Sequence, residues 1–247
     1  MKYFALILLY TVVAVGSGKA QFTETHNYTY NSGIYDIFIL KLDSSIGNGC
    51  KIVSNHDSLP EAKFFDRIGL TNYFAITASI VDSSCSPLGL FVTGDTVFKK
   101  INLINKGFGN FYNILPNGIF YVTDKNEIGI KVSAEFDTSS KYRCAIQTGP
   151  ILVNKGVVNT GLTKNSINKF IRCGIGIYKD KDGRHLVFAK SNSPVNYYDF
   201  ASLFLNAFKC DMALTLESGI HCSLHFPSAK IKYSDKIICC KYLLFKL

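Results

Sequence analysis

The chain has 247 residues and a formal net charge of +9 at pH 7, a length that suits one domain. Such a positive charge attracts anions, for example phosphates or acidic glycans. The Lys and Arg residues are scattered, with no dense basic run beside aromatic residues, so we expect no binding to nucleic acid.

The first twenty residues have the pattern of a secretory signal peptide. Lys2 is followed by an apolar run over residues 3–15 and by small residues over 16–20, as expected before a cleavage site. The alternative is an uncleaved anchor, but the apolar run is short for a membrane span. We therefore expect residues 1–20 to be removed and residues 21–247 to form one domain. That domain would be secreted or held in the lumen of the secretory pathway, with no membrane span.

Eight cysteines in a secreted chain favour disulfides over thiols or metal ligands. Their connectivity cannot be deduced, and we expect the bridges to staple a chain that has its own core. The adjacent Cys239 and Cys240 should take different partners, because a vicinal bridge is strained. Asn27 begins a glycosylation sequon near the mature N-terminus, so we expect a glycoprotein.

The first half of the chain reads as short strands with one helix. Alternating apolar residues predict strands within residues 34–53, and the spacing after Ser58 predicts a helix through Arg67. Further strands are predicted over residues 73–81, 90–92, 119–122 and 128–132. Asn117-Gly118 between apolar runs predicts a tight hairpin turn.

The second half adds a hairpin, a helix and two strands. Residues 174–178 and 185–190 predict a hairpin around Asp182-Gly183, and residue 212 begins a buried strand. After Asn196, apolar residues at helical spacing through Phe208 predict a helix with one buried stripe. Asp199 in its first turn has a structural role there, and residues 237–247 predict a terminal strand. The expected fold is α+β: β-rich mixed sheets with a few packed helices, stapled by disulfides.

The order of several segments resembles the phosphodiester glycosidase domain family over about residues 73–227. The segments are 86–92 (SPLGLFV), 109–112 (GNFY), 115–121 (LPNGIFY), 147–152 (QTGPIL), 172–176 (RCGIG), 195–201 (VNYYDFA) and 213–217 (ALTLE). The resemblance implies the family's fold and hydrolysis of a sugar-1-phosphodiester at the anomeric carbon of the sugar. Some positions depart from the family pattern. Thr77-Ala78-Ser79 stands where the family has Asn-Ala-Gly, Cys173 replaces an Asn, and Glu217 replaces an Asp.

Two residues are the catalytic candidates. Glu217 ends an apolar strand that delivers its carboxylate to a loop, where it could act as acid/base or as an electrostatic partner. Arg172 could hold a phosphate, because a guanidinium matches phosphate oxygens in pairs. The alternatives are a loop acid without a role and a surface Arg paired with an acid. We expect the two side chains to converge on a common cleft.

The candidate substrate-binding residues surround these two. Gln147 could bond sugar hydroxyls, and Gly149 and Gly174 could let the backbone approach a ligand, although they also suit ordinary turns. Asn117 suits a turn better than a ligand contact. The full set of candidate substrate-binding residues is Thr77, Ser79, Asn117, Gln147, Gly149, Gly174, Ser218 and Gly219.

No metal site or other cofactor is expected, although an assisting divalent cation remains open. His221, Cys222 and His225 mimic a metal cluster, but no helix aligns them. The expected partner is a carbohydrate phosphodiester or glycan, and the oligomeric state is open. The first interpretation is a secreted phosphodiester glycosidase. The alternative is a catalytically inactive carbohydrate-binding or decoy protein on the same scaffold, and a purely structural surface protein comes third.

Overall fold

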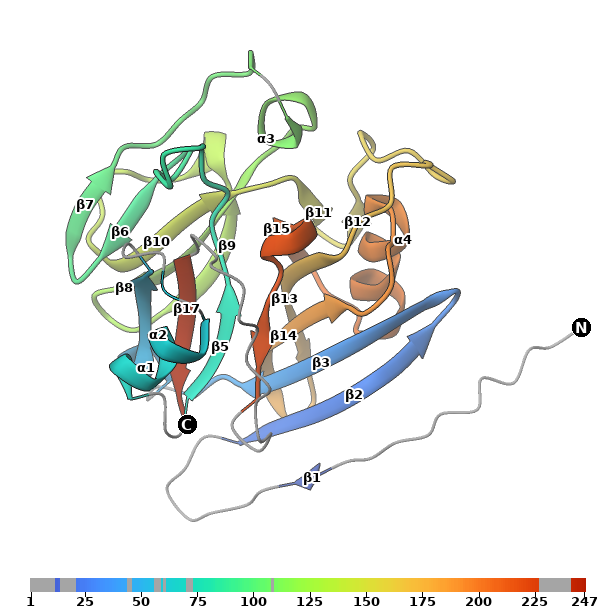
Figure 1. The fold of residues 1–247 in the computed structure, drawn as a ribbon, viewed down its shortest axis with the longest axis horizontal. Helices are drawn as coiled ribbons and strands as arrows, with labels where there is room; N and C mark the ends of the chain where they lie inside the picture. Colours follow the sequence, from blue (N-terminus) through green and yellow to red (C-terminus); the bar gives the residue numbers. More distant parts are fainter. Residues whose placement is uncertain are drawn as a thin grey trace, which may run out of the picture.

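The computed structural model describes residues 12–13, 21–43, 46–55, 59, 61–69, 73–107, 109–226 and 241–247. Three antiparallel sheets make up most of the described chain (Figure 1). The eight-stranded sheet has the spatial order β1 (Val12–Val13), β2 (Phe22–Tyr30), β3 (Gly33–Lys41), β14 (Gly183–Ser191), β13 (Arg172–Asp180), β15 (Met212–Ser218), β11 (Ile151–Asn154) and β12 (Val157–Val158).

The two smaller sheets lie beside it. The five-stranded sheet has the order β7 (Thr96–Lys99), β6 (Phe91–Thr93), β10 (Tyr142–Thr148), β8 (Gly118–Thr123) and β9 (Ile128–Val132). The four-stranded sheet has the order β16 (Leu224–His225), β5 (Tyr73–Thr77), β17 (Lys241–Lys246) and β4 (Cys50–Ser54). Figure 1 shows β17, the red strand near the C-terminus, between β4 and β5.

The helices are short. They are α1 (Ile46–Gly49), α2 (Glu61–Ile68), α3 (Asn110–Asn113), η1 (Ser133–Glu135), α4 (Tyr197–Ser202), its π-helical continuation η2 (Leu203–Ala207) and η3 (Gly219–His221).

One central core is shared by all three sheets. Apolar side chains from strands of all three sheets pack into the same interior. Phe38 of β3 stacks on Phe74 of β5 with ring centroids 3.9 Å apart, and Phe74 lies 4.7 Å from Phe188 of β14. Phe245 of β17 adds its ring 5.3 Å from Phe188. These rings join the large sheet to the four-stranded sheet.

The opposite face of the eight-stranded sheet is covered by α4 and η2, drawn in orange in Figure 1. Gly174 of β13 leaves room for this layer: a Cβ there would lie 2.9 Å from a ring carbon of Phe200. At Gly176 a Cβ would lie 2.6 Å from the sulfur of Cys210. The glycines of β13 thus let the helix approach the sheet. Gly174, predicted to face a ligand, instead faces the helix.

Most of the predicted elements are confirmed. The hairpin around residue 182 forms from β13 and β14, paired without a break from Cys173–Lys190 to Asp180–Gly183. The helix after Asn196 is α4, and the Asn196 side chain caps it by accepting a bond of 2.8 Å from the backbone N–H of Asp199.

Other predictions were wrong. Asn117-Gly118 is not a hairpin turn, because the short helix α3 precedes it and β8 pairs instead with β9 and β10. The predicted strand over 73–81 ends at Thr77. The sheets were expected to be mixed, but every strand pairing among the described residues is antiparallel.

The cysteines differ in part from the expected disulfide staples. Cys85 is disulfide-bonded. Five other described cysteines are thiols in this structure: Cys50, Cys144, Cys173, Cys210 and Cys222. Cys239 and Cys240 lie outside the described residues.

The ends of the chain are described in part. Within the predicted signal peptide the structure describes Val12–Val13, as strand β1 beside β2; the rest of residues 1–20 lies outside the described residues. Of the predicted terminal strand, β17 confirms residues 241–246. Asn27 of the sequon is exposed on β2. Among the described residues no helix has both the length and the apolar character needed to cross a bilayer.

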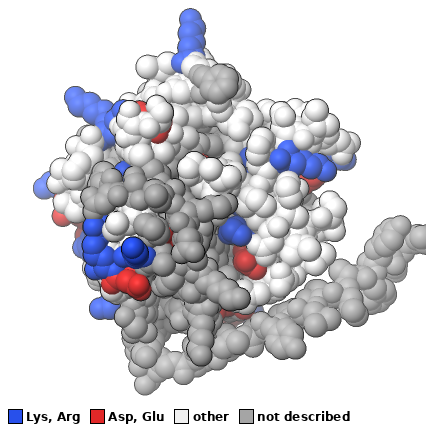
Figure 2. Space-filling view, in the orientation of Figure 1, with Lys and Arg blue, Asp and Glu red and all other residues white. Residues whose placement is uncertain are grey.

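Charged side chains are dispersed on the face shown in Figure 2, where the described Lys and Arg lie in small separate groups. The expectation that the chain does not bind nucleic acid stays a prediction.

Candidate functional site

Arg172 and Glu217 lie at the same end of neighbouring strands. Arg172 begins β13 and Glu217 is the penultimate residue of β15. In the antiparallel register, Arg172 pairs with Ser218, and Cys173 pairs with Glu217. The sheet therefore brings together two residues that are far apart in the sequence.

The register also sets their directions. Paired residues point to the same face, and successive residues point to opposite faces. Arg172 shares its face with Ser218 and with the helix α4, whereas Glu217 shares the other face with Cys173, which belongs to the central core. No ion pair joins Arg172 to a carboxylate among the described residues. The two residues therefore lie at the same strand end, as expected, but their side chains point to opposite faces of the sheet.

Arg172 is held rigidly. Its side chain is 1% exposed. Nε donates to the carbonyl of Val195 (2.9 Å), Nη1 to the Ser218 hydroxyl (3.1 Å) and Nη2 to the carbonyl of Asn168 (3.1 Å). The guanidinium also lies 3.4 Å from the ring centroid of Tyr197, a cation–π contact. Burial lowers the pKa of Arg172 from its ordinary value, but a guanidinium stays charged in proteins.

Tyr197 links this cation to its surroundings. The Tyr197 hydroxyl lies 3.2 Å from the Ser218 hydroxyl and accepts a bond of 3.2 Å from the side-chain amide of Asn110. Phe170, 50% exposed, places its ring 5.6 Å from the guanidinium. We did not predict a site role for Tyr197, Asn110 or Phe170.

Glu217 is a buried carboxyl with few partners. The residue is 9% exposed, and among the described residues one hydrogen bond reaches it, from the backbone N–H of Ser218 to Oε1 at 2.8 Å. Burial raises the pKa of Glu217 to about 8, against the smaller opposing effect of that N–H. The carboxyl is therefore protonated for the most part at pH 7, as a general acid must be.

The predicted neighbours Thr77 and Ser79 are buried near the core. Thr77 accepts a bond of 2.9 Å from the N–H of Ser223 and donates to the sulfur of Cys173 at 3.8 Å. It therefore lies on the face of Glu217. The Ser79 backbone has a φ of 91°, and its hydroxyl lies 3.5 Å from the Ile80 carbonyl.

Gln147, predicted to bond sugar hydroxyls, is occupied elsewhere. It is 1% exposed, and its Oε1 accepts from the backbone N–H groups of Leu90 (2.9 Å) and Asn102 (2.8 Å). Its Nε2 donates to the Asn102 carbonyl at 2.6 Å and to the Ser133 hydroxyl at 3.1 Å. The amide therefore fastens the loop after β7 to β10 and has no free group for a ligand.

Asn117 and Gly149 pack against each other. A Cβ at Gly149 would lie 1.9 Å from Oδ1 of Asn117, and Nδ2 of Asn117 donates to the Phe111 carbonyl at 2.6 Å. The buried Oδ1 of Asn117 has no hydrogen-bond partner among the described residues. Position 149 therefore needs a glycine because a side chain of the protein itself lies against it.

Ser218 and Gly219 form the edge between the two faces of the site. Gly219 has a φ of 79°, and a Cβ placed there would meet nothing within 4 Å. The next residue, Ile220, is 74% exposed. Space is therefore open at the turn that follows Glu217.

A second buried carboxylate lies on α2. Oε1 of Glu61 is 2.9 Å from Nε2 of His225 and accepts a bond of 2.9 Å from the Tyr242 hydroxyl, and Ser223 adds a further hydrogen bond. Burial would raise the pKa of Glu61, but these donors outweigh it and the pKa is lowered. His225 is thus engaged with an acid, and the described residues contain no group of three or more potential metal ligands.

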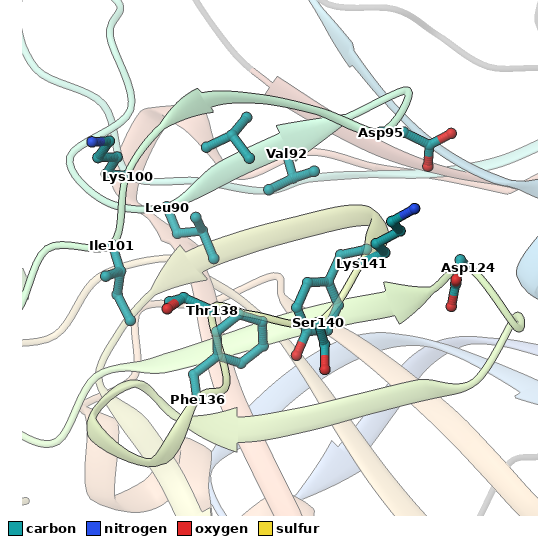
Figure 3. Close-up of a pocket in the computed structure, with 12 residues that line it drawn as sticks. Leu90, Val92, Asp95, Lys100, Ile101, Asp124, Phe136, Thr138, Ser140 and Lys141 are labelled. Carbon is teal, nitrogen blue, oxygen red and sulfur yellow. The ribbon is translucent and has the colours of Figure 1, made fainter.

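A cavity of about 930 Å³ lies elsewhere, on the outer face of the five-stranded sheet (Figure 3). Leu90, Val92 and Phe136 line its apolar part, and Lys100 and Lys141 lie at its sides. None of the predicted site residues lines it.

Comparison with known proteins identifies the family. A model of the phosphodiester glycosidase family matches residues 71–232, well over half of the chain. The chain belongs to the phosphodiester glycosidase family. Membership confirms the resemblance drawn from the sequence segments and supports a glycosidase-like function.

The relatives agree with this assignment. The uncharacterized protein YigE of Escherichia coli (strain K12) is 35% identical over 146 residues, which cover 59% of this chain and 55% of YigE. This chain thus spans about half the length of that relative. The catalytic domain of zebrafish N-acetylglucosamine-1-phosphodiester alpha-N-acetylglucosaminidase, solved in a form auto-inhibited by its pro-peptide, superimposes with a TM-score of 0.60 at 13% identity. That match covers 96% of this chain and 87% of the zebrafish chain. A hypothetical protein from Synechocystis gives a TM-score of 0.54 at 11% identity, over 92% of this chain and 62% of that chain. The structural matches show that the fold is shared.

The family segments also explain what sequence reasoning missed. Asn110 belongs to the segment 109–112, Arg172 to 172–176 and Tyr197 to 195–201, and these segments meet around one guanidinium. The sequence carries a signal for these site residues, because each segment of the resemblance contains a polar or aromatic residue. The apolar spacing in the segment 195–201 predicts a helix but does not indicate that Tyr197 faces Arg172.

Proposed function

We propose that this chain is a secreted hydrolase that cleaves a sugar-1-phosphodiester at the anomeric carbon, with Glu217 as its acid/base residue. The observation that carries the proposal is the state of Glu217, a buried carboxyl at a strand end with a pKa of about 8. Family membership supports a carbohydrate substrate. The zebrafish relative is named for hydrolysis of an N-acetylglucosamine-1-phosphodiester, which motivates this substrate class.

The reaction adds water to the anomeric carbon and breaks its bond to the phosphate oxygen. The products are the free sugar and the phosphomonoester of the aglycone. A protonated Glu217 would give its proton to the departing oxygen, and the ionised form would take a proton from the attacking water. Phosphate is already a good leaving group, so positive charge near it matters more than acid assistance.

Arg172 would supply that charge. Three of its five N–H groups have protein acceptors. The other two, one on each Nη atom, make no hydrogen bond to an acceptor in the described part of the chain. The phosphate would approach at the turn of Ser218 and Gly219, where the two faces meet and space is open. Phe170, exposed beside Arg172, would offer its ring to the sugar.

The test is hydrolysis of a synthetic sugar-1-phosphodiester in oxygen-18 water by the purified chain. We expect release of free sugar that carries the label, because water attacks carbon. Label in the phosphomonoester would show attack at phosphorus and would overturn the proposed mechanism. Absence of release at high enzyme concentration would overturn the assignment as a hydrolase.

The alternative is a carbohydrate-binding protein that has lost turnover. One observation favours it: glycosidases commonly use two carboxyl groups, and no second acid contacts Glu217 among the described residues. Calorimetric titration with the same phosphodiester separates the two functions, since the alternative predicts binding of intact substrate without release.

A further inference from the structure

Two cysteines meet directly beneath the candidate site. Cys173 follows Arg172 on β13, and Cys222 follows η3, the short helix after Ser218. Burial and the neighbouring thiol of Cys173 raise the pKa of Cys222. The sulfur of Cys173 lies 3.8 Å from the carbonyl of Ser223, and that of Cys222 lies 3.4 Å from the carbonyl of Ile171. Each cysteine is thus fixed beside the chain segment that carries the other.

A second pair has the same arrangement in the central core. The sulfurs of Cys50 on β4 and Cys144 on β10 are 3.6 Å apart, and both residues are buried. Cys210 provides the contrast: it is a buried thiol whose described surroundings contain no second cysteine sulfur. The structure therefore separates two juxtaposed pairs from one lone thiol.

We propose that Cys173–Cys222 and Cys50–Cys144 are disulfide-bonded in the mature protein. A disulfide holds its sulfurs about 2.05 Å apart, so the Cys50–Cys144 pair needs an approach of only about 1.5 Å, within reach of side-chain rotation. Cys85 is already disulfide-bonded in the same structure, which fits an oxidising compartment.

The bond forms by thiol–disulfide exchange. Cys222, the more exposed member of its pair, attacks the disulfide of an oxidant such as glutathione disulfide or a protein disulfide, and a mixed disulfide forms. Cys173 then displaces the second oxidant thiol. Two protons and two electrons leave the cysteine pair, and the oxidant is reduced to two thiols. Burial strongly raises the pKa of Cys222 in the folded chain, which disfavours the attacking thiolate, so the bonds form during folding.

The Cys173–Cys222 bond has a consequence at the site. It ties the segment after Glu217 to β13, and so fixes Ser218, which donates to Glu217 and accepts from Arg172. That this positioning of Ser218 matters for turnover rests on the proposed function. The proposal that the disulfide forms does not rest on it.

Peptide mapping tests the connectivity. The full chain is folded with reduced and oxidised glutathione, denatured without reductant, alkylated with iodoacetamide and digested with trypsin. We expect residues 173–179 to be cross-linked to residues 210–230, and residues 42–51 to residues 144–155. Cys210 lies in the same peptide as Cys222 and should be alkylated, which makes it an internal control. Alkylation of both Cys173 and Cys222 would overturn the proposal for that pair, as would a cross-link to another cysteine.

Thermal unfolding gives an independent readout. Without reductant, Cys222→Ser and Cys50→Ser should each lower Tm by roughly 5–15 °C, whereas the matched control Cys210→Ser should not lose a cross-link. With reductant present, the Tm of the wild type should fall toward the Tm values of the two variants. A wild-type Tm that is unchanged by full reduction would contradict the proposal. If Cys222→Ser does not fold, the wild-type peptide map still decides, and it does so whether or not the chain hydrolyses phosphodiesters.

Discussion

Glu61 and Glu217 are both buried carboxyls, yet their surroundings drive them to opposite protonation states. Glu61 receives hydrogen bonds from His225, Ser223 and Tyr242, and its pKa is lowered. Glu217 receives one bond, from the Ser218 backbone, and its pKa rises to about 8. Burial is common to both, so the hydrogen-bond donors and the electrostatic effect of His225 at Glu61 make the difference. A buried acid with several side-chain donors links structural elements as a carboxylate, whereas Glu217, with a single backbone donor, is able to exchange a proton near neutral pH.

The largest expected effect is on turnover. Glu217→Gln removes the exchangeable proton and should lower kcat by about 10²–10⁴-fold. The free energy of unfolding at pH 7 should rise, because the wild-type carboxyl must bind a proton on folding at this pH and the Gln side chain need not. Initial rates with a sugar-1-phosphodiester and urea unfolding measure the two quantities. Glu61→Gln is the matched control, with turnover per folded molecule unchanged. Unaltered turnover in Glu217→Gln would remove Glu217 from the mechanism.

The next effect is on stability. Glu61→Gln leaves His225 and the Tyr242 hydroxyl without their anion and should lower the free energy of unfolding by roughly 3 kcal/mol. Urea unfolding at pH 7 measures it, with Glu217→Gln as the control that should lose far less. If both variants lost the same free energy of unfolding, the hydrogen-bond donors around Glu61 would not account for a difference between the two carboxyls.

The two carboxyls should change the free energy of unfolding with pH in opposite directions. The folded state raises the pKa of Glu217, so its contribution is fully present below the unfolded pKa of about 4.3 and is lost as pH rises to about 8. The slope is at most about 1.4 kcal/mol per pH unit. Glu61 acts in the opposite direction: its contribution is present above the unfolded pKa and is lost as pH falls through its lowered folded pKa.

Urea midpoints measured from pH 3 to pH 9 test this division. Glu217→Gln should flatten the alkaline limb and leave the acid limb, and Glu61→Gln should do the reverse. A Glu217→Gln curve parallel to wild type above pH 5 would mean that the pKa of this carboxyl is not raised.

The smallest effect separates the two faces of the strand pair. Ser218→Ala removes the hydroxyl that accepts from Arg172 and contacts Tyr197, but keeps the backbone N–H that donates to Glu217. Stability should fall by about 1 kcal/mol, and the pKa governing kcat should not move. The pH–rate profile of this variant checks the claim. A shifted profile would show that the Arg172 face acts on Glu217.

Local sequence patterns determined much of the fold. Alternation of apolar residues fixed the hairpin of β13 and β14, and an amide side chain before an apolar stripe at helical spacing fixed the start of α4. The segments that carry the family resemblance also marked Arg172 and Glu217 as residues at one strand end. These features depend on neighbours in the chain, which a sequence displays directly.

Tertiary structure alone decided which polar residues are available for chemistry. Gln147 looked like a ligand contact, but its amide is occupied by the loop at Leu90 and Asn102. Gly174 looked like a backbone approach, but Phe200 fills the space. Register placed Arg172 and Glu217 on opposite faces, and long-range donors separated Glu61 from Glu217. The pKa of a carboxyl, and whether an amide is free to bond a ligand, depend on groups that folding brings from distant positions in the chain. Composition and spacing do not encode which groups these are.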